Sequence, residues 1–331
     1  MIHRLLARVR AMITGTSQDM SMFAIHSKVR FSVSLLTLVL VCCIFLPAAN
    51  AQTENFARIG ERACLSCHNR PAVTPLFETA HASRADTRSP YNDHDCESCH
   101  GASPEHRRTT SMPTAVVFEG SAVFPVSTAE QQNAVCLGCH ESGQRTHWMN
   151  SEHQFAELSC ISCHDIHQSN DPVLSRATQP AVCIGCHLEK QSQFRQRSHH
   201  PVLEGLLACS DCHNPHGSVT QNLLAGNTVA ETCFGCHAEK RGPFLWEHEP
   251  VTDNCTTCHN PHGSVVDRLL STRLPFLCQD CHQDAFHPSS LYSGDGLPPL
   301  GAAQQLLGQA CLNCHSQIHG SNHPSGSRFT R

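Results

Sequence analysis

Residues 209–218 read Cys-Ser-Asp-Cys-His-Asn-Pro-His-Gly-Ser, and residues 258–264 repeat the ending Cys-His-Asn-Pro-His-Gly-Ser. Both stretches contain the unit Cys-x-x-Cys-His, which occurs ten times and uses 20 of the 22 cysteines. The ten units are Cys64-Cys67-His68, Cys96-Cys99-His100, Cys136-Cys139-His140, Cys160-Cys163-His164, Cys183-Cys186-His187, Cys209-Cys212-His213, Cys233-Cys236-His237, Cys255-Cys258-His259, Cys278-Cys281-His282 and Cys311-Cys314-His315. We therefore take this unit as the feature that decides the fold.

The unit has the spacing that attaches c-type haem. Two thiols three positions apart share one side of a helical turn, where each can form a thioether with a vinyl group of the porphyrin. The adjacent histidine then binds the iron as its proximal ligand. A zinc ribbon requires no following histidine, a thioredoxin-like pair occurs once, and disulfides impose no histidine. Ten covalently bound c-type haems are therefore predicted.

The N-terminus predicts an export signal. Lys28 and Arg30 precede an apolar run over 31–46, and Ala49-Asn50-Ala51 has the pattern of a cleavage site. An uncleaved membrane anchor is the alternative, but a run of 16 residues is short for a membrane span. We therefore expect residues 1–51 to be removed and the protein to reach the periplasm. The remaining chain has 18 Lys and Arg against 27 Asp and Glu, which argues against nucleic acid as a partner.

Histidine is the residue most available as the second axial ligand. Residues 52–331 contain only two methionines, so Met–His ligation can serve at most two haems, whereas 14 histidines lie outside the ten units. One predicted set of distal ligands lies between paired units: His81, His153, His199, His248 and His287. The other set follows the second unit of each pair: His106, His167, His216, His262 and His319. We therefore predict bis-His ligation throughout.

Some of these assignments leave alternatives open. His199 aligns with His248 through the pattern His-x-Pro-Val, but His200 is its direct neighbour, so both are kept as candidates. His147 competes with His153. Any one of these histidines could also be a surface residue that titrates near pH 6.5. The histidines left over in this scheme are His94, His147, His200 and His323.

A distal histidine that closely follows a proximal one should bind a different haem. His167, His216 and His262 each lie three residues after a proximal histidine. Residues three apart on a helix share a face, whereas a distal ligand must approach the iron from the opposite side of the porphyrin. The sequence therefore predicts ligation between units but not the pairing.

A longer repeat joins the units in pairs. Residues 183–190 and 233–240 both read Cys-x-Gly-Cys-His-x-Glu-Lys, and both repeats close with the motif at 212–218 and 258–264. Five di-haem modules are predicted, at residues 52–125, 126–175, 176–226, 227–270 and 271–331.

The composition excludes a conventional hydrophobic core. Aromatic residues make up 5% of the chain, Gly and Pro number 19 each, and only 28 residues are available per haem. The expected fold is a multihaem cytochrome c, with short helices at the units, loops elsewhere, minimal sheet, and an elongated row of haems as its apolar interior.

These features resemble the decahaem periplasmic cytochromes of the DmsE/MtrA type. The resemblance covers almost all of residues 52–331 and rests on the ten units and on residues 209–218 and 237–248. It implies an electron carrier rather than an enzyme, with bis-His haems. It also implies insertion into an outer-membrane β-barrel porin, and transfer between periplasmic or inner-membrane cytochromes and an extracellular multihaem cytochrome or mineral.

Two other functions compete with this interpretation. A soluble periplasmic shuttle would need no barrel, although ten haems exceed what a shuttle requires. A multihaem reductase would need one haem with an open iron position, whereas all ten units end in histidine and enough distal histidines exist. The direction of electron flow has no signature in the sequence.

Overall fold

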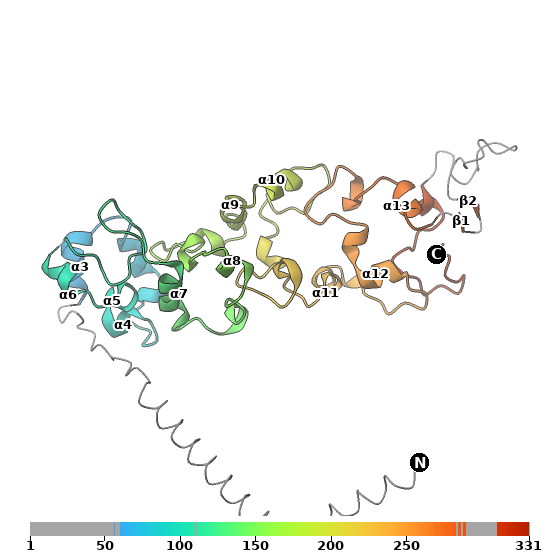
Figure 1. Cartoon of the computed structure of the whole chain (residues 1–331). Helices are drawn as coiled ribbons and strands as arrows, with labels where there is room; N and C mark the ends of the chain where they lie inside the picture. Colours follow the sequence, from blue (N-terminus) through green and yellow to red (C-terminus); the bar gives the residue numbers. More distant parts are fainter. Residues whose placement is uncertain are drawn as a thin grey trace, which may run out of the picture. The chain divides into compact units, whose positions relative to one another are not determined.

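The computed structural model describes residues 56, 60–109, 111–282, 284–285, 287–288 and 310–330. The chain divides into two compact units, Met1–Glu54 and Asn55–Arg331, and the described residues all belong to the second. The predicted signal peptide lies outside the described residues. Within the second unit, the elements follow one another in sequence order along the ribbon, from blue to red (Figure 1).

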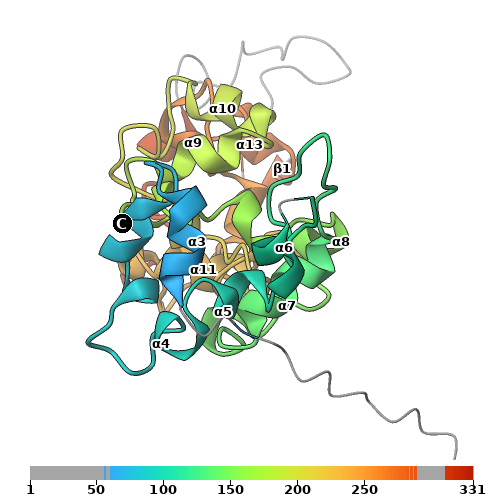
Figure 2. The same ribbon diagram turned by 90° about the vertical axis from the view of Figure 1, so that its left-hand side faces the viewer.

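Short helices and loops make up the described part of the chain (Figure 1 and Figure 2). The α-helices are α3 (Glu61–His68), α4 (Tyr91–His94), α5 (Glu97–His100), α6 (Pro104–Arg108), α7 (Ala129–Leu137), α8 (Glu152–Phe155), α9 (Gln179–Ile184), α10 (Leu188–Phe194), α11 (Val229–Phe234), α12 (Glu249–Asp253) and α13 (Phe276–Gln279). The 3₁₀-helices are η2 (Thr74–Glu78), η3 (Ala80–Ala82), η4 (Gly143–Arg145), η5 (Cys160–Ser162), η6 (Pro172–Leu174), η7 (Cys209–Asp211), η8 (Gln221–Leu223), η9 (Ala238–Lys240), η10 (Cys255–Thr257), η11 (Asp267–Leu269) and η12 (Cys311–Asn313). Two short strands, β1 (Asp284–Ala285) and β2 (His287–Pro288), pair antiparallel. The predicted fold class of short helices and loops with minimal sheet is confirmed.

A helix or a 3₁₀ turn forms at each Cys-x-x-Cys-His unit. In the second to fifth predicted modules, the first unit begins near the end of an α-helix (α7, α9, α11 or α13), and the second unit begins a 3₁₀ turn (η5, η7, η10 or η12). The side chains of Thr128 and Thr228 accept hydrogen bonds from the backbone N–H groups of Gln131 and Glu231, which caps α7 and α11. In the first module, α3 and α5 carry the two units.

Each unit is one closed turn of backbone. In the nine units after the first, the backbone N–H of the histidine donates to the carbonyl oxygen of the first cysteine, over 2.9–3.1 Å. This bond brings both cysteines and the histidine to one turn, which is the arrangement that the spacing predicts.

The apolar interior of the polypeptide is small. The buried hydrophobic residues in the described part are Ala82, Tyr91, Trp148, Ile184, Phe194, Val202, Ala208, Leu223 and Ala230, and three of these are alanines. None of the described side chains is less than 2% exposed. Such a core cannot offset the chain entropy lost on folding, so another group must fill the interior. In the part of the chain described, no helix is long and apolar enough to cross a membrane.

Buried amides join the two units of a module. Asn133 in α7 donates from Nδ2 to the carbonyl of Leu158 at 3.0 Å and accepts at Oδ1 from the backbone N–H of Cys160 at 2.7 Å. Gln179 at the start of α9 accepts at Oε1 from the backbone N–H of Ser210 at 3.0 Å. In the second and third predicted modules, the first helix therefore positions the turn that carries the second unit.

Asn133→Ala should destabilise the protein, because it leaves a buried N–H group and a buried carbonyl without their partners. The expected loss in the free energy of unfolding is about 1–3 kcal/mol. Denaturant unfolding followed by haem absorbance measures it. Glu130→Ala, on the exposed side of the same helix, is the control and should change stability by less than about 0.5 kcal/mol. Equal effects of the two substitutions would contradict the role given to Asn133.

Protein produced without haem attachment should not fold. We expect weak helical circular dichroism and rapid cleavage by trypsin, because the polypeptide buries too little apolar surface by itself. The haem-loaded protein at the same concentration is the control. A protease-resistant apoprotein with helical content equal to that of the loaded protein would overturn this expectation.

Candidate haem sites

Nine of the ten proximal histidines face a second histidine at almost the same separation. The distances between ring centres are 6.2 Å for His68–His106, 6.3 Å for His100–His167, 6.0 Å for His140–His81, 6.1 Å for His164–His216, 6.2 Å for His187–His153, 6.0 Å for His213–His262, 6.3 Å for His237–His200, 6.2 Å for His259–His319 and 6.1 Å for His282–His248. Ring centres at this separation leave about 4 Å between the nitrogens of two rings that point at each other, which is room for one metal ion bound by both.

The separation fits two imidazoles on opposite sides of one iron. A metal–imidazole bond is about 2.0 Å long and the nitrogen lies about 1.1 Å from the ring centre, so two axial imidazoles should have ring centres about 6.2 Å apart. All nine distances lie within 6.0–6.3 Å. The histidines therefore fit a haem iron held from both faces of the porphyrin.

Most of the predicted distal histidines take part in these pairs. The structure places His81, His106, His153, His167, His216, His248, His262 and His319 opposite a proximal histidine. As the spacing predicts, His167, His216 and His262 each face a unit other than the one they follow. The side chain of His287 in β2 lies outside the described residues.

The structure favours His200 over His199, which corrects the preference drawn from the sequence alignment. His200 faces His237 at 6.3 Å. The ring nitrogens of His199 are instead 2.6 Å from the carbonyl oxygen of Gln196 and 3.1 Å from the carboxylate of Glu204. Because both nitrogens already have partners, His199 has no free nitrogen to bind a metal.

The other three unassigned histidines have surroundings of a different kind. His94 stacks on Phe56 with ring centres 3.6 Å apart, and the backbone N–H of Ser325 donates to Nδ1 of His323. His147 is exposed. None of the three has a proximal histidine opposite its ring among the ring pairs given above.

One motif serves two histidine pairs at once. His153 and His200 donate from Nδ1 to the carbonyl oxygens of Pro215 and Pro261, each over 2.7 Å. These prolines directly precede His216 and His262, which belong to other pairs. The repeated Asn-Pro-His stretch thus supplies one imidazole and orients another. The sequence alone does not show this second role.

The same kind of bond fixes the tautomer of six of the paired histidines and of the remaining proximal histidine, His315. The acceptors of the Nδ1–H groups are Met112 O for His106 (2.6 Å), Pro215 O for His153, Pro261 O for His200, Asn222 O for His213 (2.7 Å), Arg268 O for His259 (2.8 Å), Arg328 O for His315 (2.5 Å) and Asp171 Oδ2 for His164 (2.6 Å). A carbonyl oxygen can only accept, so Nδ1 carries the proton and Nε2 presents its lone pair. This is the arrangement expected of histidines that bind a metal.

Burial keeps several of these imidazoles neutral. Loss of solvent lowers the pKa of His216 and of His262 to about 4, and it also lowers the pKa of His100 and His319. The pKa of His199 is raised instead, first by its hydrogen bond to Glu204. A metal binds the unprotonated ring, so the lowered pKa suits these four buried histidines to ligation, whereas the raised pKa of His199 does not.

Close backbone approach explains the glycine after each Asn-Pro-His. A Cβ atom on Gly217 would collide with the carbonyl of His147, and one on Gly263 would collide with the carbonyl of Gln193. The φ angle of Gly217 is +111°, which also disfavours a side chain. Glycine therefore lets each Asn-Pro-His-Gly loop lie directly against the backbone of an earlier segment, at His147 for one loop and at Gln193 for the other.

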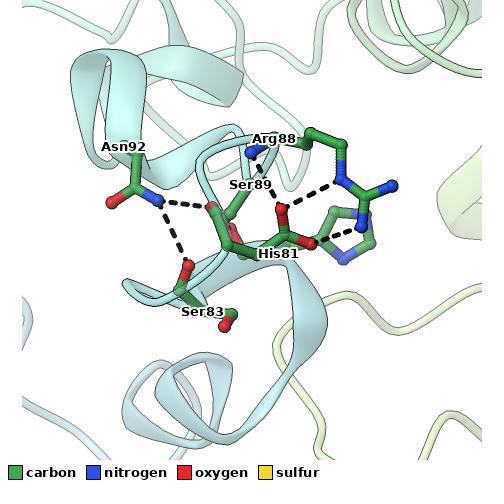
Figure 3. Close-up of polar contacts among 6 residues, drawn as sticks. His81, Ser83, Arg88, Ser89 and Asn92 are labelled. Atoms are coloured by element: carbon green, nitrogen blue, oxygen red, sulfur yellow. Dashed lines mark hydrogen bonds and ion pairs between the residues drawn. The ribbon is translucent and has the colours of Figure 1, made fainter.

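The loop that presents His81 is closed by hydrogen bonds from polar side chains (Figure 3). The hydroxyl of Ser89 donates to the backbone carbonyl of His81, and Asn92 Nδ2 donates to the carbonyl of Ser83 at 3.2 Å. Both donors lie at or near α4, so α4 anchors the 3₁₀ turn η3 that carries His81 toward His140.

The cysteines of successive units are neighbours. Within the predicted modules, the first cysteines of the two units lie beside each other: Cys64 and Cys96, Cys136 and Cys160, Cys183 and Cys209, Cys233 and Cys255, and Cys278 and Cys311. Between modules, second cysteines lie within electrostatic reach: Cys99 of Cys139, Cys163 of Cys186, Cys212 of Cys236, and Cys258 of Cys281. The attachment points therefore follow one another in sequence order without a break.

These side chains do not converge as in a site for a bare metal ion. Among the residues that the structure describes, no group of three His, Cys, Asp or Glu side chains is placed to hold one. Pairs of facing histidines with two cysteines beside one of them suit a flat, covalently attached group.

Comparison with known proteins gives the same class. Two family profiles match the chain: "Doubled CXXCH motif" at residues 199–242 and 248–287, and "Cytochrome c-type protein NrfB-like" at residues 96–179. The chain is 31% identical to "Cytochrome c-type protein NrfB" from Escherichia coli O6:H1 over 134 residues, which is 38% of this chain and 65% of that protein.

The similarity to another cytochrome extends over most of both proteins. The chain is 45% identical over 280 residues to "Multiheme cytochrome MtrA" from Shewanella baltica (strain OS185), which covers 84% of this chain and 83% of that protein. The doubled attachment motif indicates covalent c-type haems. With its paired units and facing histidines, the chain belongs to the MtrA family of multihaem c-type cytochromes and is an electron carrier.

Proposed function

We propose that the chain holds ten bis-His haems and uses them as one continuous path for electrons. The haems are numbered here in the order of their attachment units. The nine facing histidine pairs are the observation that carries the proposal, because their common separation fits axial ligands of one iron. Each pair contains the histidine of one attachment unit, so each defines one haem.

The pairs assign a distal ligand to each of the first nine haems. The proposed ligands are His106 for haem 1, His167 for haem 2, His81 for haem 3, His216 for haem 4, His153 for haem 5, His262 for haem 6, His200 for haem 7, His319 for haem 8 and His248 for haem 9. For haem 10 we propose His287, which is the one predicted distal ligand besides His199 that these nine pairs leave unused.

This assignment crosses the module boundaries in a regular way. Haems 2 to 9 take their distal histidine from a neighbouring module, whereas haems 1 and 10 take theirs from their own. Each junction between modules is then spanned by two iron–histidine links in opposite directions. The metal sites would therefore join neighbouring modules by coordinate bonds, in addition to hydrogen bonds such as those between the backbones of Ser198 and Ser264.

The adjacent residues His199 and His200 provide a matched test of the ligation. His200→Ala should convert one haem of the ten from low spin to high spin, because it removes the imidazole opposite His237. His199→Ala should leave all ten haems low spin. Electron paramagnetic resonance of the oxidised proteins gives the count, and a pyridine haemochrome assay confirms equal haem content. The reverse result, or no change in either variant, would contradict the assignment.

The order of the attachment points supports transfer along the whole chain. Electron tunnelling falls steeply with distance, so a path needs haems that are close in an unbroken series. The neighbouring cysteines form such a series from Cys64 to Cys311. We infer that electrons enter near one terminal haem and leave near the other.

Paired histidines disfavour a reductase. A haem that binds substrate needs an open or labile iron position. Nine of the ten proximal histidines each face a second imidazole, which would occupy the other side of the iron. A substrate would therefore find no open iron position at these haems. Outer-sphere electron transfer requires no open position.

For the cellular role, we propose a periplasmic cytochrome that works inside an outer-membrane β-barrel porin. The predicted signal peptide at residues 1–51 would export it. Periplasmic or inner-membrane cytochromes would exchange electrons at one end, and an extracellular multihaem cytochrome or a mineral at the other. The similarity to MtrA and the ten-haem path support this role over that of a free shuttle.

Reconstitution tests the conduit. Liposomes that enclose a redox dye would be prepared with the cytochrome and a candidate porin from the same cell, and then given an external reductant. Rapid dye reduction is expected only when both proteins are present. The porin alone and the cytochrome alone are the controls. A cytochrome that never binds a barrel during purification and transfers electrons only in free solution would favour the shuttle.

A further inference from the structure

His164 differs from the other proximal histidines in what its ring contacts. Its Nδ1 lies 2.6 Å from Oδ2 of Asp171, seven residues further along the chain. The aspartate side chain is only 10% exposed and that of the histidine 25%. The contact is thus a short, largely buried hydrogen bond between an imidazole and a carboxylate.

The equivalent histidines of the later modules donate to neutral acceptors. His213, His259 and His315 donate from Nδ1 to the backbone carbonyls of Asn222, Arg268 and Arg328. At another proximal histidine, His237, the carboxylate of Glu239 lies 3.9 Å from Nδ1 and the imidazole side chain is 55% exposed. That distance is too long for a hydrogen bond.

The surrounding backbone holds the carboxylate of Asp171 in place. Oδ1 accepts from the backbone N–H groups of Asp165 and Val173, each over 3.3 Å, and the second of these bonds caps η6. Three N–H donors therefore converge on one carboxylate, which fixes its orientation toward His164.

We propose that Asp171 lowers the reduction potential of haem 4 through His164, relative to the haems at the equivalent positions of the later modules. This inference rests on the proposed role of His164 as an iron ligand. A carboxylate that accepts a hydrogen bond from Nδ1–H makes the imidazole a stronger electron donor to the iron. The negative charge of the carboxylate also favours the oxidised state of the iron. A backbone carbonyl has the same geometry but no net charge.

The consequence concerns every electron that passes along the chain, because haem 4 lies between haems 3 and 5 in the proposed order. By lowering the potential of this haem, Asp171 would shorten the time that an electron spends on it.

Asp171→Asn tests the proposal, because the amide oxygen can still accept from His164 but carries no charge. We expect one of the ten components of a spectroelectrochemical titration to move to higher potential, while nine stay in place and all haems remain low spin. Asp267→Asn is the matched control: it removes a carboxylate eight residues after His259, but this side chain is 68% exposed and pairs with Arg197. It should move no component.

A second variant guards against a simple loss of structure. Asp171→Ser can still accept from the Val173 N–H and cap η6, but it has no charged oxygen to offer His164. With ten haems attached, it should show the same positive shift. The proposal is wrong if both variants hold ten low-spin haems with unchanged potentials, or if Asp267→Asn shifts a component equally.

Failure of the ligand assignment has a different signature. His216→Ala removes the imidazole opposite His164, so it should turn one haem high spin if His164 binds iron. If that variant stays fully low spin, the ligation is wrong. If one haem becomes high spin but Asp171→Asn changes no potential, only the role of Asp171 is wrong.

Discussion

The structure depends on one repeated interaction, two imidazoles that face each other across the width of a metal and its two bonds. Their ring centres lie 6.0–6.3 Å apart at nine places, although the sequence separation of the partners ranges from tens of residues in one direction to tens in the other. The Cys-x-x-Cys-His turns position the proximal histidine of each pair, and the loops bring the distal histidine to the position facing it.

The polypeptide achieves this with short local devices instead of a core. A turn closed between cysteine and histidine presents each unit, and buried amides such as Asn133 join two units. The Asn-Pro-His-Gly stretch combines a distal histidine, a carbonyl that orients another histidine, and a glycine that allows close backbone approach. Few large side chains are buried, because covalently attached porphyrins occupy the space that they would fill.

Closed coordination and adjacent attachment points together suit electron transfer rather than catalysis. An iron with imidazoles on both faces exchanges electrons without binding a substrate, and the unbroken series of neighbouring cysteines gives the order of transfer. Within this uniform series, the surroundings of the haems differ in the acceptor of the hydrogen bond that each imidazole donates from Nδ1. Asp171 beside His164 is the clearest departure, and a change of that kind can differentiate chemically identical haems.

The class of cofactor, its attachment units and the fold class follow from the sequence alone, because the Cys-x-x-Cys-His spacing acts within one turn and the composition rules out a core. The sequence also indicated that His167, His216 and His262 face units other than their own. The folded chain was needed to show which imidazoles meet, that His200 rather than His199 faces His237, and that Asp171 contacts His164. Those contacts depend on how loops from different modules pass one another, and the choice between two adjacent histidines depends on the direction of each side chain. An alignment of sequence repeats contains neither the path of the loops nor the direction of the side chains.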